Sequence, residues 1–197
     1  QEFFDLNLSK NLTKKKMKAD LIIANNVLAH VPDINNFIRA ISYLLKKRGV
    51  VTFEFPHLLE LIKNNQYDTV YHEHYSYLSI ISLKRIFLSN GLKIFDVQKI
   101  STHGGSLRVF AKKKNSTFHK TKKGFVNVYK QEIKHRLNSI KTYTRFQKLA
   151  DKNKYDLLKF LLNCKKKKLK VAAFGAAAKG NTLLNYAGIK PDLIEFV

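Results

Sequence analysis

Residues 19–55 constrain the fold more than any other part of the chain, because they form one complete strand–helix–strand pattern. Ala19–Ala24 is a short apolar run that two asparagines close, which is typical of a strand buried on both faces of a parallel sheet. After Asp33, a plausible helix cap, apolar residues recur at helical spacing until Gly49 stops the pattern. Val50–Phe55 is a second apolar run. The sequence therefore predicts a βαβ unit and an α/β fold.

The two predicted strands end in polar residues that should share one rim of the sheet. Asn25, Asn26 and His30 follow the first strand, and Glu54 and His57 stand at the end of the second. Ligands of open α/β sheets bind outside the carboxyl ends of the strands. We therefore expect a ligand site here, although a histidine before Val-Pro-Asp can also be an ordinary helix-entry residue.

A hairpin is predicted next along the chain. Residues 80–90 favour a helix that ends at Asn90-Gly91, and two β-prone runs follow, at Leu92–Ile100 and Gly105–Lys112. The glycine-rich segment between them suits an antiparallel turn. Its paired glycines serve the turn conformation, and they would also let the backbone approach a ligand closely.

The C-terminal third predicts a helical connector and the start of a second α/β unit. From Gly124 to Asn163 the sequence is polar, with apolar side chains about one helical turn apart. Leu169–Phe174 and Leu193–Val197 then read as strands on either side of Gly175–Thr182. This last segment is similar to a phosphate-binding turn that opens a helix, although small residues are also needed there for packing. It is not a Walker A motif, since the lysine precedes the second glycine, and no complete G-x-G-x-x-G is present.

Four consecutive ionisable residues, Tyr71-His72-Glu73-His74, form the densest polar cluster. Imidazole titrates nearest neutrality, and a neighbouring carboxylate or phenol can orient it, so the run can supply a general base. A surface polar cluster is the alternative. A further alternative is a metal site in which His72 and His74, two residues apart, bind the ion with Glu73 or His57 nearby. No H-E-x-x-H or cysteine pair supports such a site, and we expect no metal.

The charge of the chain invites comparison with nucleic-acid-binding proteins. Thirty-seven Lys and Arg against 14 Asp and Glu give 37 − 14 = +23. The lysines fall in runs at predicted element ends and linkers, and no zinc finger, RNP motif or basic zipper occurs. We therefore expect a solvated surface, compatible with an anionic diphosphate substrate, rather than a nucleic-acid interface.

The remaining composition bears on the compartment. A hydrophobic content of 45% indicates a globular chain, and no apolar run approaches the roughly 20 residues that span a bilayer. Cys164 is the single cysteine, which excludes an internal disulfide and a cysteine-based zinc site within these residues. A reducing cytoplasm fits best. The start at Gln1 carries no signal peptide and looks like a cut.

Five motifs together resemble those of the SAM-dependent sugar C-methyltransferases, which act on nucleotide-linked keto-deoxysugars. They are residues 24–33 (ANNVLAHVPD), 54–57 (EFPH), 68–79 (DTVYHEHYSYLS), 102–108 (THGGSLR) and 175–182 (GAAAKGNT). The family has an N-terminal zinc-binding region, a class I SAM domain and a C-terminal α/β domain. The resemblance covers nearly the whole chain in order, with the lysine-rich connector unmatched in detail.

The resemblance implies an organisation for the chain. Residues 1–112 would be the later part of a SAM-dependent, Rossmann-like methyltransferase domain, 113–168 a helical connector, and 169–197 the beginning of a C-terminal α/β substrate-binding domain. The glycine-rich SAM turn and the zinc-binding cysteines would precede Gln1. S-adenosylmethionine is then the expected cofactor, with zinc confined to a region outside this chain. The motifs imply nothing about oligomeric state.

The resemblance also implies a chemistry for the site. A sugar ketone of the dTDP type would lose a proton from the neighbouring carbon, and the resulting enolate would attack the methyl group. His74 is expected as the base, Tyr71 as the residue that orients the ketone, Glu73 as support and His30 as a second acid or base. Asn25 and Asn26 would face the cofactor. The residues expected to contact the substrate are His57, His103, Gly104, Gly105, Lys179, Gly180, Asn181 and Thr182. Methyl transfer to oxygen or nitrogen, and a basic nucleic-acid-binding module, are the alternatives.

Overall fold

A computed structural model describes residues 2–175 and 177–197 of the chain, which fold into two compact units. The first unit contains Gln1–Leu61 and His74–Asn138, and the second contains Ile62–Glu73 and Ser139–Val197. The division therefore falls inside the histidine-rich motif, between Glu73 and His74. The functional division at residues 112 and 168 stays a prediction.

The first unit is built on a four-stranded sheet with the strand order β1-β2-β4-β3. Its strands are β1 (Ala19–Asn25), β2 (Leu45–Pro56), β3 (Leu92–Ile100) and β4 (Ser106–Lys113). β1 and β2 are parallel, and β4 runs antiparallel to both β2 and β3. The predicted βαβ unit and the predicted hairpin are both confirmed.

Helices surround this sheet, and capping side chains begin several of them. In the first unit they are α1 (Leu6–Lys14), η1 (Leu28–His30), α2 (Ile34–Leu44), α3 (Leu58–Lys63, its last two residues in the second unit), α4 (Ile80–Ser89), η3 (Thr102–Gly104) and α5 (Lys123–Lys134). Asp33 caps α2, because its carboxylate accepts a hydrogen bond from Asn36 N at 2.9 Å. Ser79 and Ser82 form a reciprocal capping box on α4.

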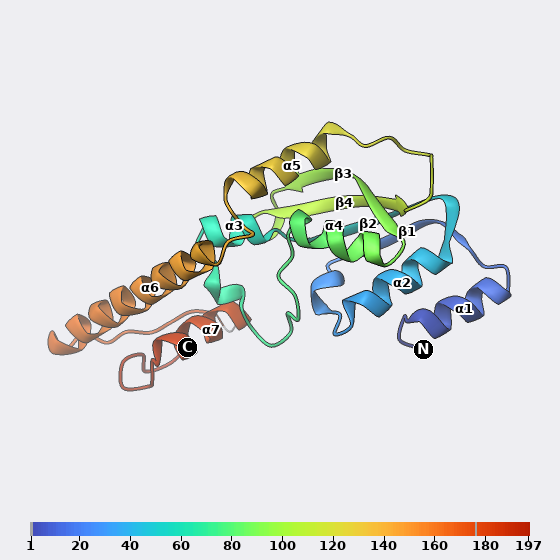
Figure 1. The fold of residues 1–197 in the computed structure, drawn as a ribbon. Coiled ribbons are helices and arrows are strands. Elements are labelled where there is room, and N and C mark those ends of the chain that lie inside the picture. The colour runs from blue at the N-terminus through green and yellow to red at the C-terminus, as the bar shows by residue number, and fades with distance from the viewer. Residues whose placement is uncertain (1, 176) are drawn as a thin grey trace. The chain divides into compact units, whose positions relative to one another are not determined.

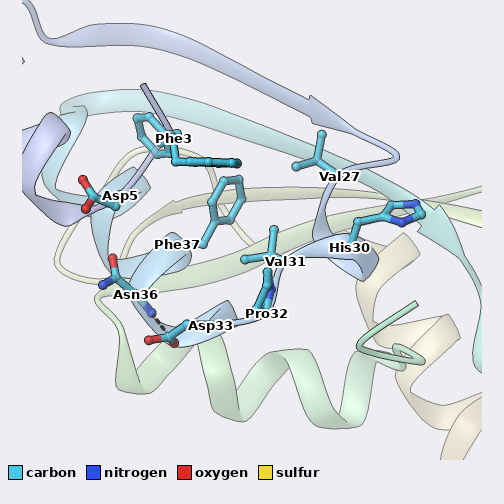
Figure 2. Close-up of a pocket in the computed structure, with 10 residues that line it drawn as sticks. Phe3, Asp5, Val27, His30, Val31, Pro32, Asp33, Asn36 and Phe37 are labelled. Carbon is cyan, nitrogen blue, oxygen red and sulfur yellow. Dashed lines mark hydrogen bonds between the residues drawn. The ribbon is translucent and has the colours of Figure 1, made fainter. Parts of the chain in front are cut away.

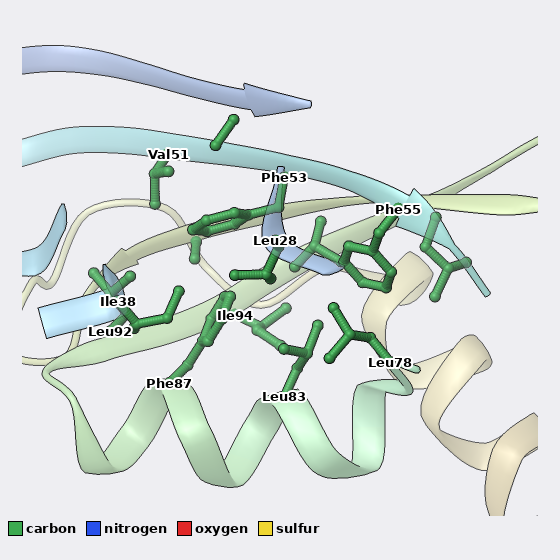
Figure 3. Packing of buried hydrophobic residues seen from close by; sticks show 14 of the residues in the cluster. Leu28, Ile38, Val51, Phe53, Phe55, Leu78, Leu83, Phe87, Leu92 and Ile94 are labelled. Carbon is green, nitrogen blue, oxygen red and sulfur yellow. The ribbon is translucent and has the colours of Figure 1, made fainter. Parts of the chain in front are cut away.

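The core of the first unit lies between the sheet and helices α2 and α4 (Figures 1 and 3). Phe53 and Phe55 of β2 are fully buried on this face, and the Phe53 ring lies 5.1 Å from that of Phe87 in α4. Alternate residues of β2 point to the opposite face. This alternation places Glu54 away from the core and at the carboxyl end of the strand.

Two local expectations are wrong. β1 is not buried on both faces, because it is an edge strand of the described sheet, where Leu21 is 56% and Ile23 64% exposed. Gly49 does not end α2, which stops at Leu44, but lies inside β2. A Cβ atom at Gly49 would come within 3.0 Å of the Ala19 carbonyl oxygen, so glycine allows the two strands to approach.

The second unit consists of η2 (Tyr67–Thr69), the long helix α6 (Ile140–Lys166) and α7 (Ala178–Ala187). Only one parallel bridge, Ala172 to Phe196, stands where two strands were expected among the described residues. Its direction is that of a βαβ unit around α7. Among the helices of residues 2–175 and 177–197, none combines the length and apolarity needed to cross a membrane.

Candidate functional site

His30 and His74 come together in the first unit although 44 positions separate them in the sequence. Their ring centroids lie 4.9 Å apart, with an angle of 50° between the planes. His30 is exposed at the end of η1 and His74 is half-buried. Two histidines of the predicted catalytic set thus share one exposed surface beyond the end of β1.

The backbone fixes this histidine pair. The carbonyl oxygen of Ala29 accepts hydrogen bonds from Tyr75 N at 2.9 Å and Ser76 N at 3.2 Å, which ties the segment after His74 to η1. The ring of Tyr77 then meets the His74 ring edge to face, at 5.9 Å between centroids. The sequence did not predict Tyr77 as a site residue, although Tyr77 lies in the same motif as His74. Its contact with the His74 ring depends on the path of the loop that joins the two residues, which the sequence does not reveal.

An apolar cavity of about 540 Å³ opens beside His30 (Figure 2). Phe3 and Phe37 stand at one end of it and Val27 and His30 at the other, as Figure 2 shows. Val27 directly follows Asn25 and Asn26, both of which are exposed at the end of β1. Asn26 adopts a left-handed backbone conformation with φ of 54° and donates its backbone N–H to the Glu54 carbonyl at 2.7 Å. The predicted cofactor residues therefore lie next in sequence to a residue that lines the cavity, but they do not line it themselves.

His57, expected to contact the substrate, is buried instead of standing on the open rim. Its Nε2 lies 2.8 Å from Oε1 of Glu132, and both side chains have no exposed surface. The Glu132 carboxylate also accepts hydrogen bonds from Ile80 N and Ile81 N at the start of α4. His57 thus belongs to a buried network. Glu132 was not predicted because its partners lie 51 to 75 residues away in the sequence.

The glycine-rich turn between β3 and β4 is held next to His57. Gly105 O accepts a hydrogen bond from His57 N at 3.0 Å. His103, Gly104 and Gly105 all have positive φ, and a Cβ atom on Gly105 would lie 2.9 Å from Glu60. Both conformation and close approach therefore require glycine at position 105. A second cavity, of about 270 Å³, is lined by His57, Glu60, Lys99, Ile100, Ser101, Gly105 and Ser106.

The other predicted site residues lie in the second unit. Tyr71 is half-buried and donates its backbone N–H to the Thr69 carbonyl at 3.2 Å, and His72 and Glu73 are exposed. The expected phosphate-binding residues occupy the start of α7, where Lys179 is exposed. They are Lys179, Gly180, Asn181 and Thr182. Ala176 of that motif lies outside the described residues. Within the described part of the chain, no three His, Cys, Asp or Glu side chains gather as a metal site would require.

Solved structures show weak similarity to the chain. Magnesium protoporphyrin IX methyltransferase (ChlM) from Synechocystis PCC 6803 with bound SAH is 21% identical with a TM-score of 0.37, over 48% of this chain and 44% of that chain. An S-adenosylmethionine-dependent methyltransferase from Clostridium acetobutylicum ATCC 824 is 15% identical with a TM-score of 0.38, over 48% and 58%. TM-scores this low carry no argument about the chain.

Sequence comparison is more informative. The C-methyltransferase NovU of Streptomyces niveus is 31% identical over 193 residues, which are 98% of this chain and 46% of that protein. The chain therefore spans about half the length of this relative. Residues 1–97 match the family profile described as a methyltransferase domain, and residues 101–197 match the profile of the C-methyltransferase C-terminal domain. The two profiles together cover nearly the whole chain, and the chain belongs to the C-methyltransferase family.

Proposed function

We propose that the protein transfers a methyl group from S-adenosylmethionine to a carbon next to the ketone of a nucleotide-linked keto-deoxysugar, of the dTDP type. The observation that carries this proposal is the His30–His74 pair, with ring centroids 4.9 Å apart beside the apolar cavity. Carbon methylation needs a base that removes a proton from a weak carbon acid, and imidazole is suited to that task near neutral pH.

His74 is the proposed base. It takes the proton from the carbon beside the ketone, and the electron pair moves onto the ketone oxygen as an enolate, whose carbon would be the nucleophile for the methyl group. SAM, when bound, supplies the electrophilic methyl group on its sulfonium. An edge-to-face contact with the Tyr77 ring restrains the His74 ring, and His30 can exchange a proton with the substrate from the adjacent position.

The motifs suggest three further roles, all for residues of the second unit. Tyr71 would orient the ketone or donate a hydrogen bond to its oxygen, and Glu73 would balance the charge of the histidines. Lys179 at the start of α7 would meet an anionic part of the substrate, since helix amides and a lysine both favour phosphate. These roles rest on the resemblance of the motifs.

The cofactor is assigned to the apolar cavity. Its aromatic wall of Phe3 and Phe37 offers a surface on which an adenine ring can stack, and its volume of about 540 Å³ is within the range of small-molecule pockets. Asn25 and Asn26 directly precede Val27, which lines the cavity, and we assign their amide groups to the polar part of the molecule. The free thiol of Cys164 suits a cytoplasmic protein.

The test is solvent-deuterium exchange into the sugar carbon, measured by NMR on the full-length protein with a dTDP-linked keto-deoxysugar and no SAM. His74→Asn should lower the exchange rate about 100-fold or more, the usual contribution of a general base. His72→Asn is the matched control, because His72 is exposed and has no assigned role. Exchange at the wild-type rate in His74→Asn would remove His74 as the base.

The same experiment separates the alternatives. Methyl transfer to oxygen or nitrogen needs no carbon acid, so an absence of exchange in the wild-type protein would favour that chemistry. Salt-sensitive association with DNA or RNA, together with no thermal stabilisation by S-adenosylhomocysteine, would favour a nucleic-acid-binding module.

A further inference from the structure

Arg108 and Glu54 form an ion pair that the proposed proton transfer does not use. Glu54 lies two residues before the end of β2 at Pro56 and is 7% exposed. Oε2 of its carboxylate accepts hydrogen bonds from Arg108 Nη2 at 2.9 Å and Nε at 3.3 Å. Glu54 and Arg108 are register partners on adjacent strands. A buried carboxylate thus fixes the guanidinium at the rim where parallel-sheet ligands bind.

The pair leaves part of the guanidinium available. The Arg108 side chain is 40% exposed, against 9% for that of Glu54. A guanidinium has five N–H donors in a planar fork, and those on Nη1 have no partner among the residues that the structure describes. A fork held by a carboxylate on one side is already oriented for an anionic oxygen on the other, so little rotamer freedom is lost when it binds.

The surroundings of Arg108 indicate which anion it meets. Asn25 is the register partner of Glu54 on its other side, so the three side chains stand in one row across β1, β2 and β4. Arg108 is also three residues from Gly105, in the strand that leaves the glycine-rich turn. The row therefore joins the end of β1 to the turn that we assign to the substrate.

We infer that Arg108 binds a phosphate oxygen of the nucleotide-linked sugar, from a guanidinium that Glu54 holds in place. The inference rests on the proposed function, because it takes the nucleotide sugar as the substrate. Arginine suits this task, since its fork matches the geometry of phosphate oxygens. The α-carboxylate of S-adenosylmethionine has the same anionic-oxygen chemistry and is the competing source.

Binding measurements on the full-length protein distinguish these sources. Isothermal titration calorimetry with dTDP and, separately, with S-adenosylhomocysteine should be run on the wild type and on Arg108→Met. We expect dTDP affinity to fall about tenfold or more, as for the loss of a charged hydrogen bond, and S-adenosylhomocysteine affinity to stay within about twofold.

Arg85→Met is the matched control. Arg85 is exposed on α4, so this substitution removes the same positive charge as Arg108→Met but leaves the rim of the sheet unchanged. An equal loss of dTDP affinity in both variants would reduce the effect to overall charge and overturn the inference. A loss confined to S-adenosylhomocysteine would assign Arg108 to the cofactor carboxylate, and also overturns it. If wild-type exchange occurs and Arg108→Met binds dTDP normally, the inference fails while the proposed function stands. A wild type that binds no dTDP overturns both the substrate class and the role of Arg108.

Discussion

Glu132 of α5 should be the most sensitive position in the first unit. Its carboxylate is fully buried and accepts hydrogen bonds from Ile80 N at 2.7 Å and Ile81 N at 2.8 Å, the first two amides of α4. The same carboxylate lies 2.8 Å from His57 Nε2. One side chain therefore caps a helix and anchors the residue that follows β2, so its removal affects three buried groups at once.

The expected loss follows from those three groups. Glu132→Ala leaves two amides and one imidazole nitrogen buried without an acceptor, at about 1–3 kcal/mol for each unsatisfied group before the structure relaxes. Because three buried groups lose their acceptor and the structure then partly relaxes, we expect the free energy of unfolding to fall by about 3–5 kcal/mol. Glu132→Gln keeps the volume and one acceptor oxygen, so its loss should be smaller, about 1–3 kcal/mol.

Urea unfolding, followed by circular dichroism and by hydrogen exchange of the Ile80 and Ile81 amides, measures this loss. Lys130→Ala on the exposed face of α5 is the control and should change stability by less than about 0.5 kcal/mol. Combining Glu132→Ala with His57→Ala should cost less than the sum of the two single changes, because they break the same network. A loss below about 1 kcal/mol in Glu132→Ala, or unchanged protection of the two amides, would refute the capping role.

Two further predictions concern the second unit and the apolar cavity. The pKa of Tyr186 is raised above 10.0 chiefly by its hydrogen bond to Asp151, and burial raises the pKa of Tyr67. A raised phenol pKa adds stability that is present below pH 10 and lost as pH rises through the folded-state value, so unfolding by urea should become easier above pH 10. Tyr186→Phe should weaken that dependence and cost about 1 kcal/mol at neutral pH; an unchanged alkaline slope would contradict this. Val27→Trp should fill the cavity from a 39% exposed position and lower S-adenosylhomocysteine affinity in calorimetry about tenfold, with an unchanged melting temperature of the unliganded protein; wild-type affinity would place the cofactor elsewhere.

The elements that local sequence determines were predictable. The helix after Asp33 and the strand at Val50–Phe55 follow from periodicity and capping, and the hairpin follows from two β-prone runs around paired glycines. The exposure of Leu21 and Ile23 was not predictable in the same way. An apolar run predicts a strand. Whether that strand is buried depends on which helices and strands pack beside it, and this is decided by the fold as a whole.

In the candidate site too, residue types were predictable from the sequence and contacts between distant residues were not. The sequence predicted His30 and His74 as proton carriers from residue type alone. Their contact depends on the Ala29 carbonyl, which accepts hydrogen bonds from the backbone of Tyr75 and Ser76. His57 had the right type and the right place at the end of a strand, and the structure turns it inward toward Glu132. Residue chemistry can therefore be predicted locally, whereas orientation depends on partners far away in the sequence.

The lysine excess shows the same dependence on position. Lys14 ends α1, and Lys165 and Lys166 end α6, where positive charge interacts favourably with the helix carboxyl terminus. Lys112 is buried instead, and its ammonium donates hydrogen bonds to the carbonyl oxygens of Ser116 and Phe118 at 2.8 and 2.6 Å. Burial lowers the pKa of this lysine. These lysines thus stabilise the helix ends and loops in which they lie. The net charge of +23 is therefore only weak support for a nucleic-acid partner.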